Sequence, residues 1–400
     1  MPAYQTGRNK AVDLKVESTL GTPPGASGAT RLRVAPSSGL TLKKATVLPT
    51  EFRADGMTVQ ARHGSKSVDG EYMMDLIVGA ADALFEAGAR GTWFPSFTYT
   101  NTTGTSVTAQ AGPPSTFTFA AGSLITAGIK VGDIVRMNAT GGPAGNNNRN
   151  LRVTAVTATL LTVAETLTLD ATPRTTFTLT VLKRLVQGTT SRSFTFEEKD
   201  LDASVSKQFV GCRIAKVMLS FKPDATVQVT FGLVGQDMNV ISGGSYPYFT
   251  SPTVATGIGL VCSDGKVRVN GVDSIDFTGL DITIDLGGAT QPVIGSMISP
   301  DVFLNPAKIT GQLTGLRSDL SRLGLFTAET QFEIGVLCVA PMSEPKDCVH
   351  FYFGNCKYMG QSDGMGQDNA LIETLPINIG LDEAGGAHVS TMFLMSTSAA

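Results

Sequence analysis

Residues 68–85 read VDGEYMMDLIVGAADALF, and residues 309–326, which lie 241 positions later, read ITGQLTGLRSDLSRLGLF. Each stretch opens with a β-type residue and a glycine, Gly70 or Gly311, and continues with apolar residues at helical spacing. We therefore predict, in both stretches, the end of a strand followed by a short amphipathic helix. Such a repeat has to be identified before a fold is assigned, because each copy is a structural unit of its own.

The repeat extends beyond these stretches, but the first copy is interrupted. Downstream of the helix the offset between matching segments falls from 241 to 154, which predicts an insertion of 87 residues in the first copy. A surface loop can carry such an insertion at small entropic cost. The further matching segments are 39–42 with 279–282, 176–182 with 330–337, 211–213 with 354–357, and 226–235 with 371–380.

Short runs of alternating apolar and polar residues, separated by many of the 44 glycines and 19 prolines, predict a mainly β chain. We expect two β-sandwich or barrel modules, each with one flanking α-helix, and a small inserted β domain. Asp55-Gly56 predicts a hairpin turn between alternating runs. The predicted limits are 1–30 for an N-terminal arm, 31–95 and 176–250 for the first module, 96–175 for the inserted domain, and 251–400 for the second module. Disorder is the alternative for residues 1–30.

Composition excludes several classes of protein. A net charge of −3 argues against a protein that grips nucleic acid by its phosphates, since that requires a clustered basic surface. Five cysteines at irregular spacing argue against a disulfide framework. The first ten residues, MPAYQTGRNK, have no apolar core of a secretory signal, and no run approaches eighteen apolar residues, so we expect no membrane span.

The sequence offers no constellation of catalytic, cofactor-binding or metal-binding residues. His63, His350 and His388 lie in three different contexts, and no nucleophile elbow accompanies them. Cys338, Cys348, His350 and Cys356 lack the paired short spacings of a zinc site, and alternation along a pair of strands explains them. Residues 363–369 (DGMGQDN) resemble a calcium loop only faintly. We therefore predict no site residues, no cofactor and no enzyme activity.

The arrangement resembles the tail tube proteins of long-tailed, siphovirus-like bacteriophages, in the larger form that carries the tube module twice. The resemblance covers most of the chain outside the insertion, as a pattern more than as a diagnostic motif. It is carried by the segment VESTLGTP (16–23), the hairpin from Leu40 into VDG (68–70), the helix to Phe85, and the runs SFTFE (193–197) and FVGCRI (209–214).

The resemblance implies a structural virion protein, the major tail tube subunit, made in the host cytoplasm. In that family, modules close into rings, and the rings stack into the hollow tube that conducts DNA into the host during ejection and entry. Implied partners are further copies of the chain, in rings of three or six chains, the tape measure protein and DNA in the lumen, and tail terminator and baseplate proteins at the ends. Loops 47–66 and 286–308 would bridge stacked rings.

The alternative is another virion β-protein, such as a baseplate, fibre or decoration protein that binds a host surface glycan. Sugar sites are built from exposed Trp and Tyr side chains. The chain has one Trp and seven Tyr, which gives this alternative little support.

Overall fold

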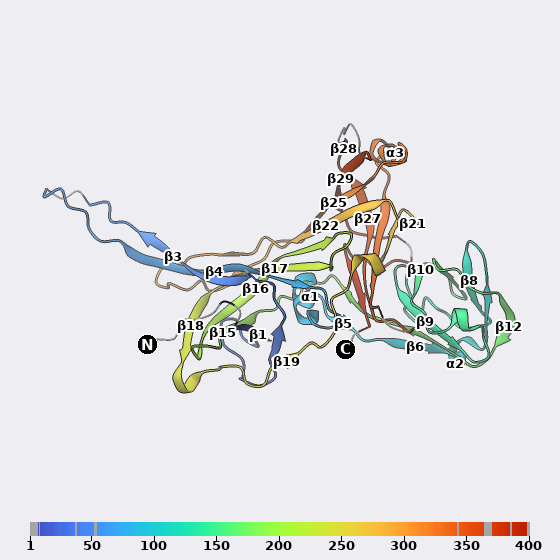
Figure 1. Ribbon diagram of the computed structural model, residues 1–400, viewed down its shortest axis with the longest axis horizontal. Helices are drawn as coiled ribbons and strands as arrows, with labels where there is room; N and C mark the ends of the chain where they lie inside the picture. Colours follow the sequence, from blue (N-terminus) through green and yellow to red (C-terminus); the bar gives the residue numbers. More distant parts are fainter. Residues whose placement is uncertain are drawn as a thin grey trace.

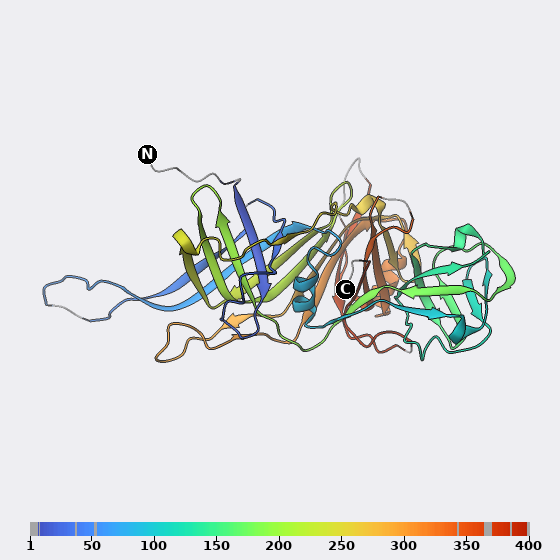
Figure 2. The same cartoon turned by 90° about the horizontal axis from the view of Figure 1, so that it is seen from below.

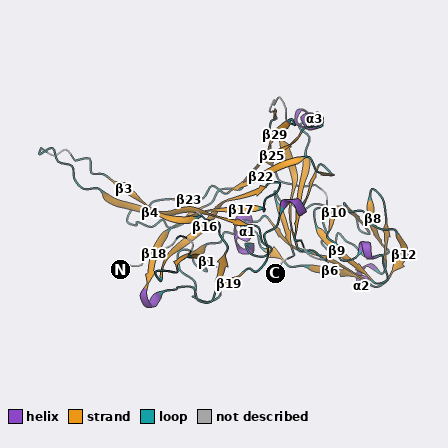
Figure 3. Cartoon of the chain, in the orientation of Figure 1, coloured by secondary structure: helices purple, strands orange, loops and turns teal. Residues whose placement is uncertain are grey.

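The structure is a computed structural model that describes residues 7, 9–36, 38–51, 54–341, 344–363, 370–384 and 386–397. Strands make up half of it and helices are few, which confirms the predicted mainly β class (Figure 3). The strands form one large hydrogen-bonded network and a separate eight-stranded sheet at one end of an elongated molecule (Figure 1). A short pair, β23 (Ala289–Thr290) and β24 (Val302–Phe303), forms a two-stranded sheet of its own.

The first unit of the large network has two layers that share one strand, β16 (Val205–Phe221). The outer layer runs β2-β1-β15-β16-β18, the inner layer runs β3-β4-β17-β16, and all neighbours are antiparallel. The other elements are β1 (Lys10–Val16), β2 (Thr30–Leu32), β3 (Gly39–Val47), β4 (Arg62–Asp75), β15 (Phe194–Asp200), β17 (Gln228–Gly235), β18 (Asp237–Ser242), the 3-10 turn η2 (Gly243–Ser245) and β19 (Thr253–Val254), which lies parallel to β2.

Strand β16 changes layer at Gly211. Its first half pairs with β15 and β18, and its second half, from Arg213, pairs with β17. Gly211 has a φ of +65°, and a Cβ atom there would lie 2.3 Å from Oε1 of Gln236. Only glycine meets both conditions without strain. The corner in the strand therefore depends on this residue.

The second unit repeats the same order with different strands. Its outer layer runs β21-β20-β26-β27-β30, and its inner layer runs β22-β25-β29 followed by the end of β27 and by β28. Its elements are the 3-10 turn η3 (Cys262–Asp264), β20 (Lys266–Val269), β21 (Val272–Ser274), β22 (Phe277–Asp285), β25 (Lys308–Leu316), β26 (Phe332–Val339), β27 (Cys348–Tyr358), β28 (Ser362–Asp363), β29 (Ile372–Ile379) and β30 (Phe393–Ser396).

The two units agree in register as well as in order. In the first unit Phe194 pairs with Cys212, and the register then slips by one residue before Phe196 pairs with Phe209. In the second unit Phe332 pairs with Cys356, and the same slip precedes the pair of Ile334 with Phe353. An irregularity of the ladder repeated at the same place distinguishes a repeated unit from two unrelated sheets.

The register corrects the predicted length of the insertion. Strand β4 corresponds to β25 at an offset of 241, as predicted, but β15 corresponds to β26 at an offset of 138. The insertion is therefore 103 residues long, and the prediction of 87 was wrong. The error came from matching residues 176–182 with 330–337, because β13, at 177–181, belongs to the inserted sheet and ends after the predicted limit of 175.

The expected N-terminal arm is also corrected. Residues 10–16 form β1, which lies between β2 and β15 and buries Val12 and Leu14 in the core. This strand corresponds to β20, which pairs with β26 in the same way. Pairing with a segment almost two hundred residues away gives no local signal. Residues 1–6 and 8 of the expected arm lie outside the described residues.

Each unit carries the short helix that the opening stretches predict. Helix α1 (Asp82–Ala89) follows β4 and buries Leu84 and Phe85. The ring of Phe85 packs edge-on against Phe231 and Phe351, so this helix joins the cores of both units. Helix α3 (Ser321–Thr327) follows β25 and has no fully buried residue.

The eight-stranded sheet lies between α1 and β15 in the sequence and is antiparallel, in the order β12-β7-β8-β11-β10-β9-β13-β6. The strands β5 (Trp93–Phe94) and β14 (Lys183–Val186) lead into and out of it and join the outer layer of the second unit beside β30. Its elements are β6 (Phe97–Thr100), α2 (Asn101–Gly104), β7 (Val107–Gln110), β8 (Ser115–Phe119), β9 (Ile134–Ala139), η1 (Ala144–Asn146), β10 (Leu151–Val156), β11 (Leu160–Val163), β12 (Asp170–Arg174) and β13 (Phe177–Val181).

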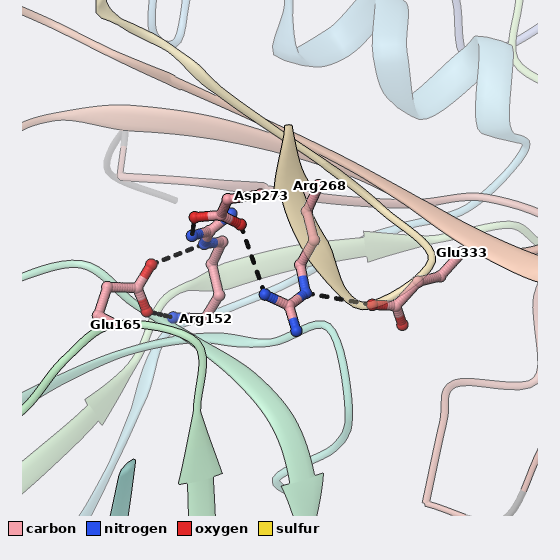
Figure 4. Close-up of polar contacts among 5 residues, drawn as sticks. All are labelled: Arg152, Glu165, Arg268, Asp273 and Glu333. Carbon is pink, nitrogen blue, oxygen red and sulfur yellow. Dashed lines mark hydrogen bonds and ion pairs between the residues drawn. The ribbon is translucent and has the colours of Figure 1, made fainter. Parts of the chain in front are cut away.

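A chain of ion pairs fastens the inserted sheet to the second unit (Figure 4). Arg152 of β10 is buried and binds Glu165 of its own sheet and Asp273 of β21, each at 2.6 Å. Asp273 also contacts Arg268 at 3.4 Å, and Arg268 contacts Glu333 of β26 at 3.3 Å. Charges taken out of water in this way are tolerated only when they are paired.

We predict that Arg152→Met destabilises the protein by about 3 to 5 kcal/mol, because it leaves the buried Glu165 carboxylate without its partner. Urea unfolding measures the change, and Arg152→Met/Glu165→Gln should recover part of the loss. Arg149→Met is the matched control, since Arg149 is only partly buried and its side chain donates to the backbone carbonyl oxygens of Gly145 and Thr166. A loss no larger than that of the control would contradict the role given to Arg152.

His350 of β27 predicts a pH dependence of stability. Burial, followed by the charge of Arg152, lowers the pKa of His350 to about 3, against about 6.5 in an unfolded chain. Between these values the unfolded chain binds a proton that the folded chain does not, so the unfolding free energy should fall as the pH falls from about 6.5 towards 3, by about 1 kcal/mol per pH unit.

His350→Gln should flatten this slope by about that amount, as measured by urea unfolding at a series of pH values. His63→Gln controls for the loss of a histidine from an exposed position on β4. Equal slopes in the parent protein and in His350→Gln would refute the prediction.

Candidate functional surface

The inner layers of the two units form one continuous sheet. Residues 216–221 of β16 pair with residues 280–285 of β22, from Lys216 with Asp285 to Phe221 with Leu280. The resulting order is β3-β4-β17-β16-β22-β25-β29-β28. One surface of a single chain thus extends across both copies of the repeat.

One face of this sheet is the core face, where apolar side chains alternate along every strand from β3 to β29 as period-two patterning requires. These residues are buried, with the exception of Leu42, which is partly buried. They are Leu40, Leu42, Val68, Tyr72, Met74, Val229, Phe231, Leu233, Val217, Leu219, Phe221, Leu280, Ile282, Ile284, Ile309, Leu313, Leu375, Ile377 and Ile379.

The opposite face, which we call the polar face, carries mostly polar and charged side chains that are exposed or half-buried. A sheet with one face on the core and the other in solvent shows this alternation. The polar face consists of Thr41, Lys43, Ser67, Asp69, Glu71, Met73, Asp75, Gln228, Thr230, Val234, Arg213, Lys216, Met218, Ser220, Asp281, Thr283, Asp285, Lys308, Thr310, Gln312, Thr314, Thr374, Pro376 and Asn378.

Acidic groups outnumber basic groups on the polar face, where five carboxylates stand against three lysines and Arg213, which forms an ion pair with Asp301. Lys43 is already engaged by Asp69, at 2.6 Å. Both side chains of this pair are more than half exposed, so the pair contributes little to stability. The polar face therefore presents a mildly negative, mostly neutral surface with no basic cluster.

Two long loops leave the same end of this sheet. Residues 48–61 join β3 to β4 at the tip of a hairpin that projects far from the body, and residues 286–307 join β22 to β25 and extend in the same direction (Figures 1 and 2). The second loop docks on the first hairpin, where the N–H of Lys66 donates to the carbonyl of Met297 at 2.7 Å. The predicted Asp55-Gly56 turn lies in the first loop, but β4 begins only at Arg62.

Both loops expose several large apolar side chains, and exposed apolar patches mark contact surfaces. The first loop and its flanking strand expose Val47, Leu48, Met57 and Val59, and the second exposes Val293, Ile294, Met297, Ile298 and Phe303.

The histidines and cysteines of the sequence lie in separate structural settings. Among the described residues, no group of three or more His, Cys, Asp or Glu side chains is placed to hold a metal ion. Cys338, Cys348 and Cys356 are buried along β26 and β27, and burial raises the pKa of each thiol, to about 12 for Cys348. His63 lies on β4, while His388 contacts Asp133 of the inserted sheet at 2.9 Å. Residues 364–369 of the faint calcium loop lie outside the described residues.

Sequence reasoning did not find the polar face, although a signal for it was present. Each of its strands alternates visibly, as in TVQVTFGLV before Gly235. What the alternation could not show was that the strands of both copies lie in one sheet, because this depends on the pairing of β16 with β22.

None of the helices in the described part of the chain has the length and apolar character that a membrane span requires.

Comparison with known proteins is consistent with this architecture. The phage tail tube protein family matches residues 154–345, a segment that begins in β10, includes the pairing of β16 with β22 and ends in the loop before β27. No curated protein sequence matches the chain. The family match confirms the resemblance seen in the sequence: over residues 154–345, just under half of its length, the chain is similar to the phage tail tube proteins, a family of structural tail components.

Proposed function

We propose that the chain is the major tail tube subunit, whose rings stack into the tube that conducts phage DNA into the host cell. The observation that carries this proposal is the continuous inner sheet, in which two copies of one unit present a single polar face. In a ring of such sheets, the polar face lines the lumen and the core face packs against the outer layers.

The composition of the polar face suits the passage of DNA. A lumen that bound phosphates would hold the genome by counterion release and slow its transit. The polar face has five carboxylates against three lysines and Arg213, and both Lys43 and Arg213 are already in ion pairs, with Asp69 and Asp301, so the face offers DNA no row of free basic groups. Its neutral Thr, Ser, Asn and Gln side chains keep the channel hydrated without binding the backbone.

Two units in each chain favour a ring of three chains over a ring of six. Three chains supply six units, and closure into a ring removes the strand edges that an isolated sheet exposes to aggregation. The inserted sheet lies at the far end of the molecule from the projecting hairpin (Figure 1). We place it on the outside of the tube.

The proposed partners are the terminator and baseplate proteins at the ends of the tube and the tape measure protein in its lumen.

Electron microscopy of the purified protein tests the proposal, with native mass spectrometry of any rings. We expect hollow tubes or rings with three chains in each ring. Rings of six chains would keep the tube function and refute the stoichiometry. A monomer that does not assemble at any concentration or salt would refute the tube function, and a glycan screen of the inserted sheet would then test the alternative of a host-binding virion protein.

The projecting hairpin of β3 and β4 should affect the stacking of rings without affecting the assembly of a single ring. Met57 is 70% exposed near its tip, and we expect Met57→Asp to abolish tubes while single rings persist, because a charge cannot be buried between rings without a partner. Leu169→Asp is the matched control, since Leu169 is 62% exposed on the inserted sheet and tubes should tolerate it. Tube lengths in electron micrographs give the readout. Normal tubes from Met57→Asp would exclude this hairpin from the stacking contact.

A further inference from the structure

The outer layer of the first unit encloses one lysine and two carboxylates. Lys199 and Glu197 of β15 are two residues apart, so their side chains point to the same face, and Glu197 pairs directly with Asp13 of β1. Nζ of Lys199 lies 2.7 Å from Oδ2 of Asp13 and 3.4 Å from Oε2 of Glu197. A primary amine is thus held in contact with one carboxyl group, with a second carboxylate beside it.

These three groups are shielded from water. The side chains of Asp13 and Glu197 have no exposed surface, and 3% of the Lys199 side chain is exposed. The segment between η2 and β19 covers them. Its N–H groups at Tyr248 and Phe249 donate to the Glu197 carboxylate at 2.9 and 2.8 Å, and Lys199 donates to the Phe249 carbonyl at 2.7 Å. Burial favours a reaction between amine and carboxyl groups, because it removes the water that stabilises their charged forms.

The repeat shows that the fold does not require this cluster. In the second unit, Gly335 and Leu337 of β26 occupy the positions of the carboxylate and the lysine of β15, and Arg268 of β20 occupies the position of Asp13. The ladder of β20 with β26 forms without the cluster. The amine and its two carboxylates therefore belong to the first unit alone, and the pairing of the strands does not account for them.

We propose that Lys199 and Asp13 join in an intramolecular isopeptide bond, with Glu197 as the proton carrier. The ammonium group first gives a proton to Oδ2 of Asp13, which leaves a neutral amine and a neutral acid in contact. Nζ then attacks Cγ of Asp13 and forms the C–N bond. Glu197 takes a second proton from Nζ and passes it to the Oδ2 hydroxyl group. The bond from Cγ to Oδ2 breaks, one water molecule leaves, and Glu197 ends as the carboxylate that it was at the start.

Arg31 of β2 completes the site. It pairs directly with Asp13, and its Nε lies 2.7 Å from Oδ1, the oxygen that stays bonded to carbon. Negative charge collects on this oxygen when the amine attacks, so a fixed guanidinium beside it stabilises the tetrahedral intermediate. After the reaction, the charges that remain are those of Arg31 and Glu197. They are of opposite sign, so the buried site stays neutral.

The bond encloses the whole inserted sheet in a covalent loop, because residues 13 and 199 lie on either side of it in the sequence. Covalent links that close long loops stabilise a folded chain by restricting its unfolded state. The bond therefore holds β1 to β15 even when the hydrogen bonds between these two strands open.

Mass spectrometry of the intact protein and of its tryptic peptides tests the bond. We expect the parent protein to be lighter than its sequence by one water molecule. In the denatured protein, trypsin should not cleave after Lys199, and peptide 11–15 should be attached through Asp13 to peptide 193–207. Lys66 is an internal control, since it contacts Asp237 at 3.0 Å with a side chain that is 25% exposed, and it should be cleaved normally.

Two variants separate the chemistry from the fold. Lys199→Arg keeps a positive charge beside Asp13 but supplies no primary amine, so this variant should have the full mass of its sequence. Glu197→Gln keeps an oxygen that can accept the two backbone N–H groups but cannot carry the proton. We expect it to form the bond more slowly by about a hundredfold, measured as the linked fraction at fixed times after synthesis. Circular dichroism of both variants reports on the fold.

The outcomes decide the proposal whether or not the protein forms tubes. A loss of one water molecule that maps to Asp13 and Lys199 supports the bond. Full mass with normal cleavage after Lys199 overturns it. A loss of water that maps to an aspartate followed by glycine, such as Asp55-Gly56, also overturns it, because a succinimide has the same mass. Equal rates of linkage in the parent protein and in Glu197→Gln overturn the role of Glu197.

Discussion

The path of β16 is the constraint on which the rest of the structure depends. This one strand belongs to both layers of the first unit and to the joint with the second unit, so its hydrogen bonds fix three sets of neighbours at once. Its corner lies at Gly211, where the backbone N–H donates to the buried carboxylate of Glu17. Because side chains alternate along a strand, a slip of one residue anywhere in β16 would reverse the faces of all these neighbours.

The same constraint separates the two faces of the inner sheet. Apolar residues of β16, β22 and their neighbours meet in one core with Phe85 of α1 and Phe351 of β27. Removal of this apolar area from water drives association of the units. The polar face follows as a consequence, since it is the other half of the same alternation. The core and the polar face therefore arise from one sequence pattern.

The inserted sheet is held by a different kind of interaction. It has its own apolar core, yet its contact with the second unit includes the ion pairs of Arg152 and the contact of His388 with Asp133. Buried ion pairs are weak contributors to net stability but are sensitive to geometry. These ion pairs orient the inserted sheet on the second unit. In the sequence, by contrast, the inserted sheet lies between two elements of the first unit, α1 and β15.

The sequence by itself determined the mainly β class, the repeat centred on residues 68–85 and 309–326, and the existence of an insertion, because alternation, helical spacing and turn residues are local signals. Matches that lie close to these signals, such as Cys212 with Cys356, agree with the register of the structure. Only the tertiary structure decided the limits of the insertion, the place of β1 in the sheet and the union of both copies into one polar face. These features depend on hydrogen bonds between strands that lie far apart in the chain. Local alternation shows that a segment is a strand, but it does not identify the strand with which that segment pairs.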